Sequence, residues 1–221
     1  MKRAMLFAMT EHDDLLALPT APWALAALDL VVTREHRPLA NHSIRSYLFA
    51  RLLAEHEGMC AEVDPGLLFA ATVLHDIGLC ADTTSRERFE VDGADQAAEF
   101  LRANGFGEPE VDVVWEAIAL HTSSGIAERR GPVAMLTRAG VGMDFGWGTE
   151  IVDDEQARRI HQAYPRLSMA VSLVDAIVAQ CEKAPAKGPR YSIASELTRE
   201  RRTPPHLTQL EQAAATSRWG D

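Results

Sequence analysis

The sequence of 221 residues has few cysteines and no long apolar run. Its three cysteines, Cys60, Cys80 and Cys181, lie far apart, and no CxxC pair is present. This pattern argues against a disulfide framework and against a cysteine-type zinc site, so we expect each cysteine to be a small buried side chain. No apolar run approaches the roughly 20 residues that cross a bilayer, and no membrane partner is expected.

Basic residues are also scarce. Lys and Arg together number 22 against 32 Asp and Glu, which gives a net charge of −10. Such a chain repels the phosphate backbone, so a nucleic acid polymer is excluded as a partner and a small-molecule substrate is expected. The N-terminal stretch MKRAMLFAMTEHDD brings in acidic residues too early for a signal peptide, which predicts a cytoplasmic protein. Whether the chain forms a homo-oligomer stays open.

A succession of helical patterns makes up the rest of the chain. Apolar residues recur near a spacing of 3.6, and Pro, Gly and capping residues mark the boundaries, while no stretch alternates with a period of two. We therefore predict an all-α fold that forms a single domain over residues 1–221, with C-terminal helices over about 153–217. The expected helices cover residues 20–36, 41–58, 64–78, 92–104, 107–125, 131–146, 153–163, 166–183 and 206–217, with an irregular stretch at 79–91 and a polar linker, KAPAKGPRYS.

Histidines and carboxylates gather near the ends of these helices. His42 follows Asn41, the expected N-cap, and His75 and Asp76 end the apolar helix 64–78 in the sequence TVLHDIG. His121 and Asp144 close two further helices. Side chains at helix ends can converge at one end of a bundle, and imidazole nitrogens with carboxylate oxygens bind Zn, Fe, Mn or Ni. An aspartate in an apolar run must also be paired or ligated, because an isolated buried charge is costly.

The order H…HD…D resembles the HD-domain metal-dependent hydrolases. Five segments in sequence order are similar to the cyanamide hydratase branch of that superfamily and cover about residues 41–147: NHSIRSYLFA, LLFAATVLHDIG, RFEVDGADQAAEFL, AIALHTSSGIAERRGP and GVGMDFGW. The resemblance implies a helical bundle whose converging helix ends hold one divalent metal, Zn²⁺ in the first place and Fe²⁺ or Mn²⁺ as alternatives. The metal ligands that it implies are His42, His75, Asp76 and Asp144.

The same resemblance implies the addition of water to cyanamide to give urea. The candidate catalytic residues are Asp76, His121 and Glu90, and the candidate substrate-binding residues are His121, Ser123 and Asp92. Structural roles compete with these: His121 can interact with a helix dipole, Asp92 can act as an N-cap, and Ser123 can cap a turn.

Two differences from the motifs of other HD-domain enzymes distinguish between the branches of the superfamily. Many HD-type nucleotidases carry a carboxylate three residues after the aspartate, and here that position is Leu79. The mixed-valence di-iron HD oxygenases need further histidines between the HD pair and the final aspartate, where this chain has His121 alone. Hydration of a small nitrogenous compound is therefore the favoured function. A phosphohydrolase, a di-iron oxygenase and a non-catalytic HD scaffold remain as alternatives.

Overall fold

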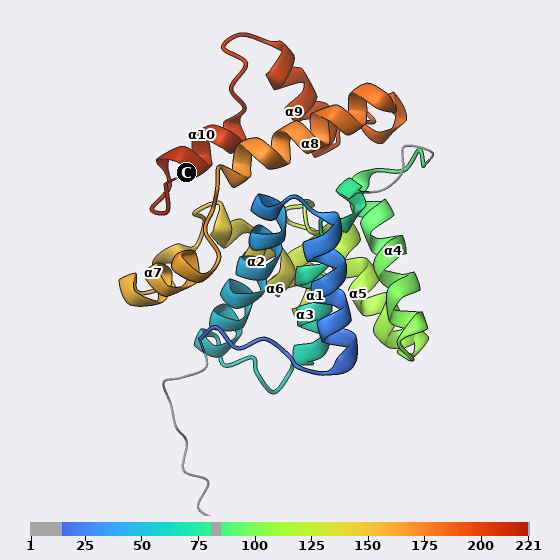
Figure 1. Cartoon of the computed structure of the whole chain (residues 1–221), viewed down its shortest axis with the longest axis vertical. Helices are drawn as coiled ribbons and strands as arrows, with labels where there is room; N and C mark the ends of the chain where they lie inside the picture. Colours follow the sequence, from blue (N-terminus) through green and yellow to red (C-terminus); the bar gives the residue numbers. More distant parts are fainter. Residues whose placement is uncertain (1–14, 81–84, 221) are drawn as a thin grey trace, which may run out of the picture.

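A computed structural model describes residues 15–80 and 85–220, and the regular secondary structure of this part of the chain is entirely helical (Figure 1). It contains no strand, which confirms the all-α prediction. The N-terminal stretch considered above as a signal peptide lies outside the described residues. The α-helices are α1 (Pro22–Arg34), α2 (Arg37–His56), α3 (Pro65–Val73), α4 (Phe89–Ala103), α5 (Glu108–Leu120), α6 (Pro132–Asp144), α7 (Asp154–Ala163), α8 (Met169–Lys183), α9 (Ile193–Arg202) and α10 (Gln209–Thr216); the short 3₁₀ helices are η1 (Ile77–Cys80), η2 (Ala127–Arg129), η3 (Thr149–Ile151) and η4 (Pro185–Lys187).

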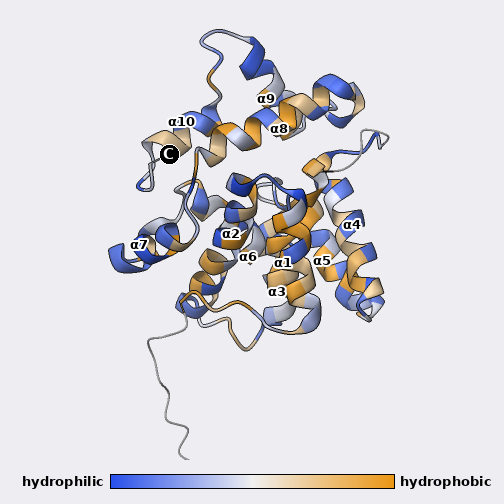
Figure 2. Cartoon of the chain, in the orientation of Figure 1, coloured by the Kyte–Doolittle hydropathy of each residue, from blue (hydrophilic) through white to orange (hydrophobic). Residues whose placement is uncertain are grey.

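The helices form a bundle with a second layer on one end. Helices α1 to α6 make the bundle, α7 lies at its side, and α8, α9 and α10 lie across the end of the bundle (Figure 1). Apolar residues colour most of α3 in Figure 2, and every residue of α3 from Leu67 to Val73 is buried. A separate apolar cluster joins the two layers, because it combines Leu39, Leu79 and Phe145 with residues of α8 to α10. The bundle end beneath α8 is therefore covered.

Helices α2 and α6 pack against each other without room for a side chain at their crossing. A Cβ on Gly140 would lie 2.3 Å from the Ser46 carbonyl oxygen, so glycine is required at this position. His42 lies one turn before Ser46 on α2, and Asp144 lies one turn after Gly140 on α6. The antiparallel contact therefore brings His42 and Asp144 together.

The start of α2 differs from the prediction. The helix begins at Arg37, four residues before the expected 41, with Pro38 in its first turn, a position that proline tolerates. Asn41 is thus within the helix and not its N-cap; its side-chain amide donates a hydrogen bond to the Pro165 carbonyl (2.7 Å). His42 consequently lies in the second turn of α2 and not in the first.

The end of α3 is also a correction. The helix ends at Val73, so His75 and Asp76 lie in the turn between α3 and η1, not in the last turns of a helix reaching Gly78. Close contact with α4 explains the turn, since a Cβ on Gly78 would lie 2.0 Å from the Phe89 carbonyl oxygen. The His75 side chain donates to the Thr72 carbonyl (2.7 Å), which satisfies one of the acceptors left open at the helix end.

Three further predictions need correction. Helix α4 begins at Phe89 after Arg88, so Asp92 lies inside its first turn and is not its N-cap. Helix α9 was not predicted, because its apolar residues are few and its second half is the charged run Arg199–Arg202. Among the cysteines, Cys181 is buried as expected, Cys80 is partly exposed, and Cys60 is exposed, which contradicts the prediction for Cys60.

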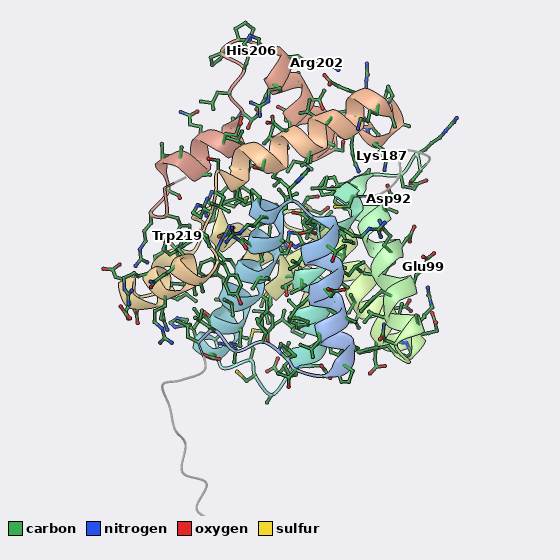
Figure 3. The ribbon with its side chains drawn as sticks, viewed as in Figure 1. Asp92, Glu99, Lys187, Arg202, His206 and Trp219 are labelled. Carbon is green, nitrogen blue, oxygen red and sulfur yellow. The ribbon has the colours of Figure 1, made fainter. Side chains whose placement is uncertain are left out.

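Polar contacts attach the C-terminal layer to the bundle. Lys187 in η4 reaches Asp92 on α4, as Figure 3 shows, and both side chains are buried. Gln180 on α8 donates to the carbonyls of Gly78 and Leu79 at 2.9 and 3.0 Å. Among the described helices, none combines the length and the apolar content of a membrane span.

Candidate metal centre

Three buried histidines are held in the same tautomer. In each ring Nδ1 is bonded to a protein acceptor, so it carries the hydrogen and Nε2 is left with its lone pair. Carbonyl or carboxylate partners of this kind orient the imidazoles of metal sites. The bonds run from His42 to Asp144 Oδ2 (2.6 Å), from His75 to the Thr72 carbonyl (2.7 Å) and from His121 to the Ile118 carbonyl (2.7 Å).

The Nε2 atoms of these histidines converge on Asp76. Those of His42 and His75 are 3.3 Å apart, and they lie 3.8 and 3.3 Å from Asp76 Oδ2. The Nε2 atom of His121 approaches the other oxygen, Oδ1, at 3.8 Å. Donor atoms of His42, His75 and Asp76 all lie within 4.8 Å of one another, close enough for a single ion to contact all three.

The unsatisfied atoms of this cluster fit a bound cation. Asp76 Oδ2 is buried and accepts no hydrogen bond from the described residues. The nearby His42 and His75 Nε2 atoms turn lone pairs toward it, and none of the three side chains is more than 2 % exposed. An orphaned buried acceptor beside two imidazole lone pairs calls for an ion, and this nitrogen–oxygen set suits a divalent metal such as Zn, Fe or Mn.

The electrostatics of the metal-free cluster point the same way. Burial acts to lower the pKa of His75, but the adjacent Asp76 carboxylate outweighs it and the pKa is raised. Burial acts to raise the pKa of Asp76, and His75 holds it well below its usual range. Burial lowers the pKa of His42, which keeps this ring neutral. Both shifts indicate that a positive charge beside Asp76 is favoured, and a divalent ion would supply it.

Asp144 lies on the far side of His42 from the donor cluster. The carboxylate accepts two hydrogen bonds from Arg45, both 2.7 Å long, and one from Arg166 at 3.2 Å. Although burial opposes it, Arg45 holds the pKa of Asp144 far below its usual range. The family resemblance implies Asp144 as a metal ligand, whereas the structure places it against Nδ1 of His42 and outside the group of three donors.

His121 is next to the cluster, at the C-terminal cap of α5. Burial lowers its pKa to about 4, so the ring is neutral and Nε2 can accept a hydrogen bond. Thr122 follows His121 in the chain, and its hydroxyl donates a hydrogen bond (2.7 Å) to the carboxylate of Glu90, which is fully buried. Arg88 also pairs with Glu90. Burial acts to raise the pKa of Glu90, but the hydrogen bond from Arg88 acts against it. The pKa is lowered overall, so the carboxylate stays charged.

The two remaining predicted residues lie away from the cluster. The Asp92 carboxylate accepts hydrogen bonds from Lys187 and Ser85, which account for its burial. Ser123 is in the turn after α5, where its backbone N–H donates to the Leu120 carbonyl (2.7 Å). Neither residue lines the cavity described next, whereas Thr122, which the sequence analysis did not select, does.

A cavity of about 100 Å³ opens onto the donor atoms. His42, His75, Asp76 and His121 form one part of its wall, and most of the remainder is apolar. Helices α8, α9 and α10 close it on the side of the second layer. Arg138 is the one arginine or lysine in the wall; its buried Nε lies 3.9 Å from Glu128 and has no hydrogen-bond partner among the described residues.

Glu35 is a buried carboxyl group near the site that the sequence analysis missed. It is 5 % exposed, its Oε2 accepts a hydrogen bond from Ser43 (3.2 Å), and its Oε1 has no hydrogen-bond partner among the described residues. Burial and then the negative charge of Asp76 raise its pKa to about 8, so it is protonated at neutral pH. Glu35 is the C-cap of α1, and its spacing of four residues from Val31 is the one sequence signal that could have placed it on the core side.

Comparison with known proteins agrees with this geometry. A protein-family model for the HD domain matches residues 39–180 of the 221-residue chain. The matched span contains every donor of the cluster, together with His121 and Asp144. A search of curated proteins found no match.

Proposed function

Because the chain belongs to the HD-domain family, whose members are generally metal-dependent hydrolases, we propose that it adds water to a small, neutral nitrogenous compound. The family and the His/His/Asp cluster establish metal-dependent hydrolase-type chemistry. Hydration of cyanamide to urea is the specific reaction that we propose for it.

The observation that carries this proposal is the size and polarity of the cavity beside the donors. Pockets for drug-sized ligands usually hold about 300–1,000 Å³. The cavity here measures about 100 Å³, and apart from the donors, His121, Thr122 and Arg138 its wall is apolar. Leu79, where nucleotidases carry a water-activating carboxylate, is buried in the apolar cluster under α8. A small uncharged substrate suits this site better than a nucleotide.

We assign His42, His75 and Asp76 to the metal, with Zn²⁺ as the proposed ion and Fe²⁺ or Mn²⁺ as alternatives. These residues would hold the ion, which would supply polarisation of the nitrile group and a lowered pKa for water at the site. Asp144 stays a predicted fourth ligand, but its contacts support another role: it fixes the His42 tautomer, and to bind the metal it would have to give up hydrogen bonds from Arg45.

Proton transfer in the proposed reaction falls to His121. Its neutral Nε2 accepts a proton from water as the water oxygen bonds to the nitrile carbon, and it returns a proton to the nitrile nitrogen. Tautomerisation of the resulting isourea gives urea, so no further reactant is needed. Glu90 acts through Thr122. It accepts a hydrogen bond from the Thr122 hydroxyl and so holds this hydroxyl in the cavity wall.

The test is direct. Metal-replete protein is incubated with cyanamide and urea is measured, with chelator-treated protein and His75→Ala as controls. Urea formation that requires both the metal and His75 supports the proposal. No urea from metal-replete protein removes cyanamide as the substrate, while the metal content of the same sample still reports on the site.

A phosphohydrolase is the second candidate, and Arg138 in the cavity wall is the observation in its favour. An arginine can bind phosphate through two parallel hydrogen bonds. Phosphate release from a panel of nucleotides and other phosphoesters would support it, and inactivity across the panel would count against it.

A further inference from the structure

We propose that the preferred substrate is a nitrile-type compound, such as a dialkylcyanamide, that carries a compact uncharged apolar substituent, which Leu173 and Ile177 of α8 select by size. The inference rests on the hydration reaction proposed above for the same site. It concerns the part of the substrate that does not react.

The cavity wall combines polar and apolar groups. The donors and His121 share it with Phe89, Val141, Phe145 and Trp147, which form apolar surface. The ring centroids of Phe145 and Phe89 lie 5.4 and 5.8 Å from those of His42 and His121. Unsubstituted cyanamide is polar at both ends and would leave this apolar surface against water. A hydrocarbon group there would remove the apolar surface from water, which is favourable in proportion to the area buried.

The volume of the cavity also exceeds what cyanamide needs. About 10–15 Å³, measured with a water-sized probe, is enough for one water molecule. The cavity of about 100 Å³ therefore has room for several more carbon atoms than cyanamide contains. It remains too small for a long chain, which limits the substituent to a few carbons.

The remaining wall favours an uncharged substituent. Beyond the donors and His121 it is apolar except for Thr122 and Arg138. Thr122 directs its hydroxyl hydrogen to Glu90 (2.7 Å), while Arg138 lies 3.9 Å from Glu128 and its buried Nε has no hydrogen-bond partner among the described residues. An unpaired charge is costly in a largely apolar space, so we expect an uncharged substituent, and a charged nitrile tests whether Arg138 binds an anion instead.

Residues of the second layer form the surface that limits the size of the substituent. Leu173 and Ile177 are 6 % and 2 % exposed and lie one turn apart on the same face of α8. Ile193 of α9 and Leu210 of α10 extend the same surface. None of these residues is a candidate metal ligand or proton carrier, so we expect them to act on the substituent through its size.

The experiment compares kcat/KM for cyanamide, dimethylcyanamide and diethylcyanamide on metal-replete wild-type protein, with cyanoacetate as a charged nitrile. We expect kcat/KM to rise roughly three- to fourfold for each carbon added, as for the burial of a methylene group. Cyanoacetate should be turned over more slowly than any of the neutral compounds.

Leu173→Ala tests the selecting surface, because it enlarges the cavity. The ratio of kcat/KM for diethylcyanamide to that for dimethylcyanamide should increase severalfold in this variant. Val171→Ala is the matched control on the same helix, since Val171 is 37 % exposed and does not line the cavity; its ratio should equal that of wild type. Ile177→Val makes a smaller cavity change and serves if Leu173→Ala does not fold.

The outcomes separate this inference from the function on which it rests. If cyanamide is hydrated as fast as or faster than its dialkyl derivatives, the inference is wrong and the hydratase remains. If none of the compounds is hydrated, the proposed reaction is wrong. Calorimetric affinities for the metal-loaded protein then decide the inference: tighter binding of diethylcyanamide than of cyanamide supports it, and equal or weaker binding overturns it.

Discussion

Single residues at the metal centre owe their chemistry to the partners behind them. His42 offers Nε2 to the cluster because Asp144 accepts the hydrogen on Nδ1, and Asp144 is in turn held by Arg45. Glu35, by contrast, has one oxygen without a hydrogen-bond partner among the described residues. The two carboxyl groups are both buried, yet one is charged and the other is neutral at pH 7. Two predictions follow from this difference in partners.

Replacing Asp144 tests its role as the counter-charge of buried arginines. Arg45 is fully buried and Arg166 is 6 % exposed, so Asp144→Asn removes a charge that both contact. Breaking a buried ion pair costs about 3–5 kcal/mol, and we expect a loss of that size in urea unfolding of chelator-treated protein. Asp64→Asn is the control, because asparagine caps a helix as well as aspartate does. Unchanged stability of metal-free Asp144→Asn would contradict this role.

The raised pKa of Glu35 predicts how the stability of the protein changes with pH. Burial, with the charge of Asp76 as the second cause, raises its pKa from 4.5 to about 8 in the folded chain. Between these values the folded chain binds a proton that the unfolded chain has released, so stability falls as the pH rises. Glu35→Gln cannot titrate, and its metal-free form should lose less stability between pH 5 and 8, by roughly 1–4 kcal/mol. Parallel pH profiles for the two proteins would argue against a protonated Glu35.

The residues of the donor cluster were predictable from the sequence, but the side chains that contact the neighbouring carboxyl groups were not. His42, His75 and Asp76 were identified from the order H…HD, and the structure brings them together. The place of Asp144 depends on Arg45, 99 residues earlier in the chain, and no local pattern reports such a contact. Glu35 was missed for the same reason, since its environment comes from other parts of the fold.

At the scale of elements, the turn that carries His75 and Asp76 depends on one close contact. Gly78 of η1 lies against the first turn of α4, where a Cβ would come within 2.0 Å of one backbone atom and 2.5 Å of another. The periodicity of residues 64–78 predicted a continuous helix, because local apolar spacing does not register a contact with a later helix. The actual end of α3 at Val73 is what directs the HD pair toward His42.

Gly78→Ala tests this contact. The backbone of α4 must shift to admit the methyl group, and overpacking of this kind costs about 1–3 kcal/mol or more. We expect that loss in denaturant unfolding, together with weaker metal binding, because the turn moves with its two donors. Gly107→Ala is the matched control, since its Cβ would meet only ordinary contacts at 3.5 and 3.7 Å. Equal stability and metal affinity of the two variants would rule out the proposed constraint.

At the scale of the whole molecule, the site is shared between the bundle and the layer that covers it. The family match ends at residue 180, within α8, whereas Ile193 and Leu210 beyond it also line the cavity. We therefore propose that the C-terminal helices belong to a single functional domain with the bundle. The sequence predicted α8 and α10 but not α9, and it gave no sign that these helices cover the metal centre, because that depends on packing between distant segments.

The buried pair of Lys187 and Asp92 tests this attachment. Their side chains are 1 % and 8 % exposed and join η4 to α4. Lys187→Met leaves a buried carboxylate without its cation, and we expect a loss of about 3–5 kcal/mol in denaturant unfolding. Lys187→Met combined with Asp92→Leu removes both charges and should recover part of that loss. A single variant as stable as wild type would show that the pair does not hold the layer in place.

Metal content tests the central claim most directly. Elemental analysis of purified wild-type protein should find about one divalent metal ion per chain, because one cluster of three donors can hold it. His75→Ala and Asp76→Ala should hold none, while His121→Ala should keep the ion and lose activity. Equal metal loss in all three variants would make His121 a ligand. Wild-type protein without stoichiometric metal would contradict the account and leave a non-catalytic scaffold.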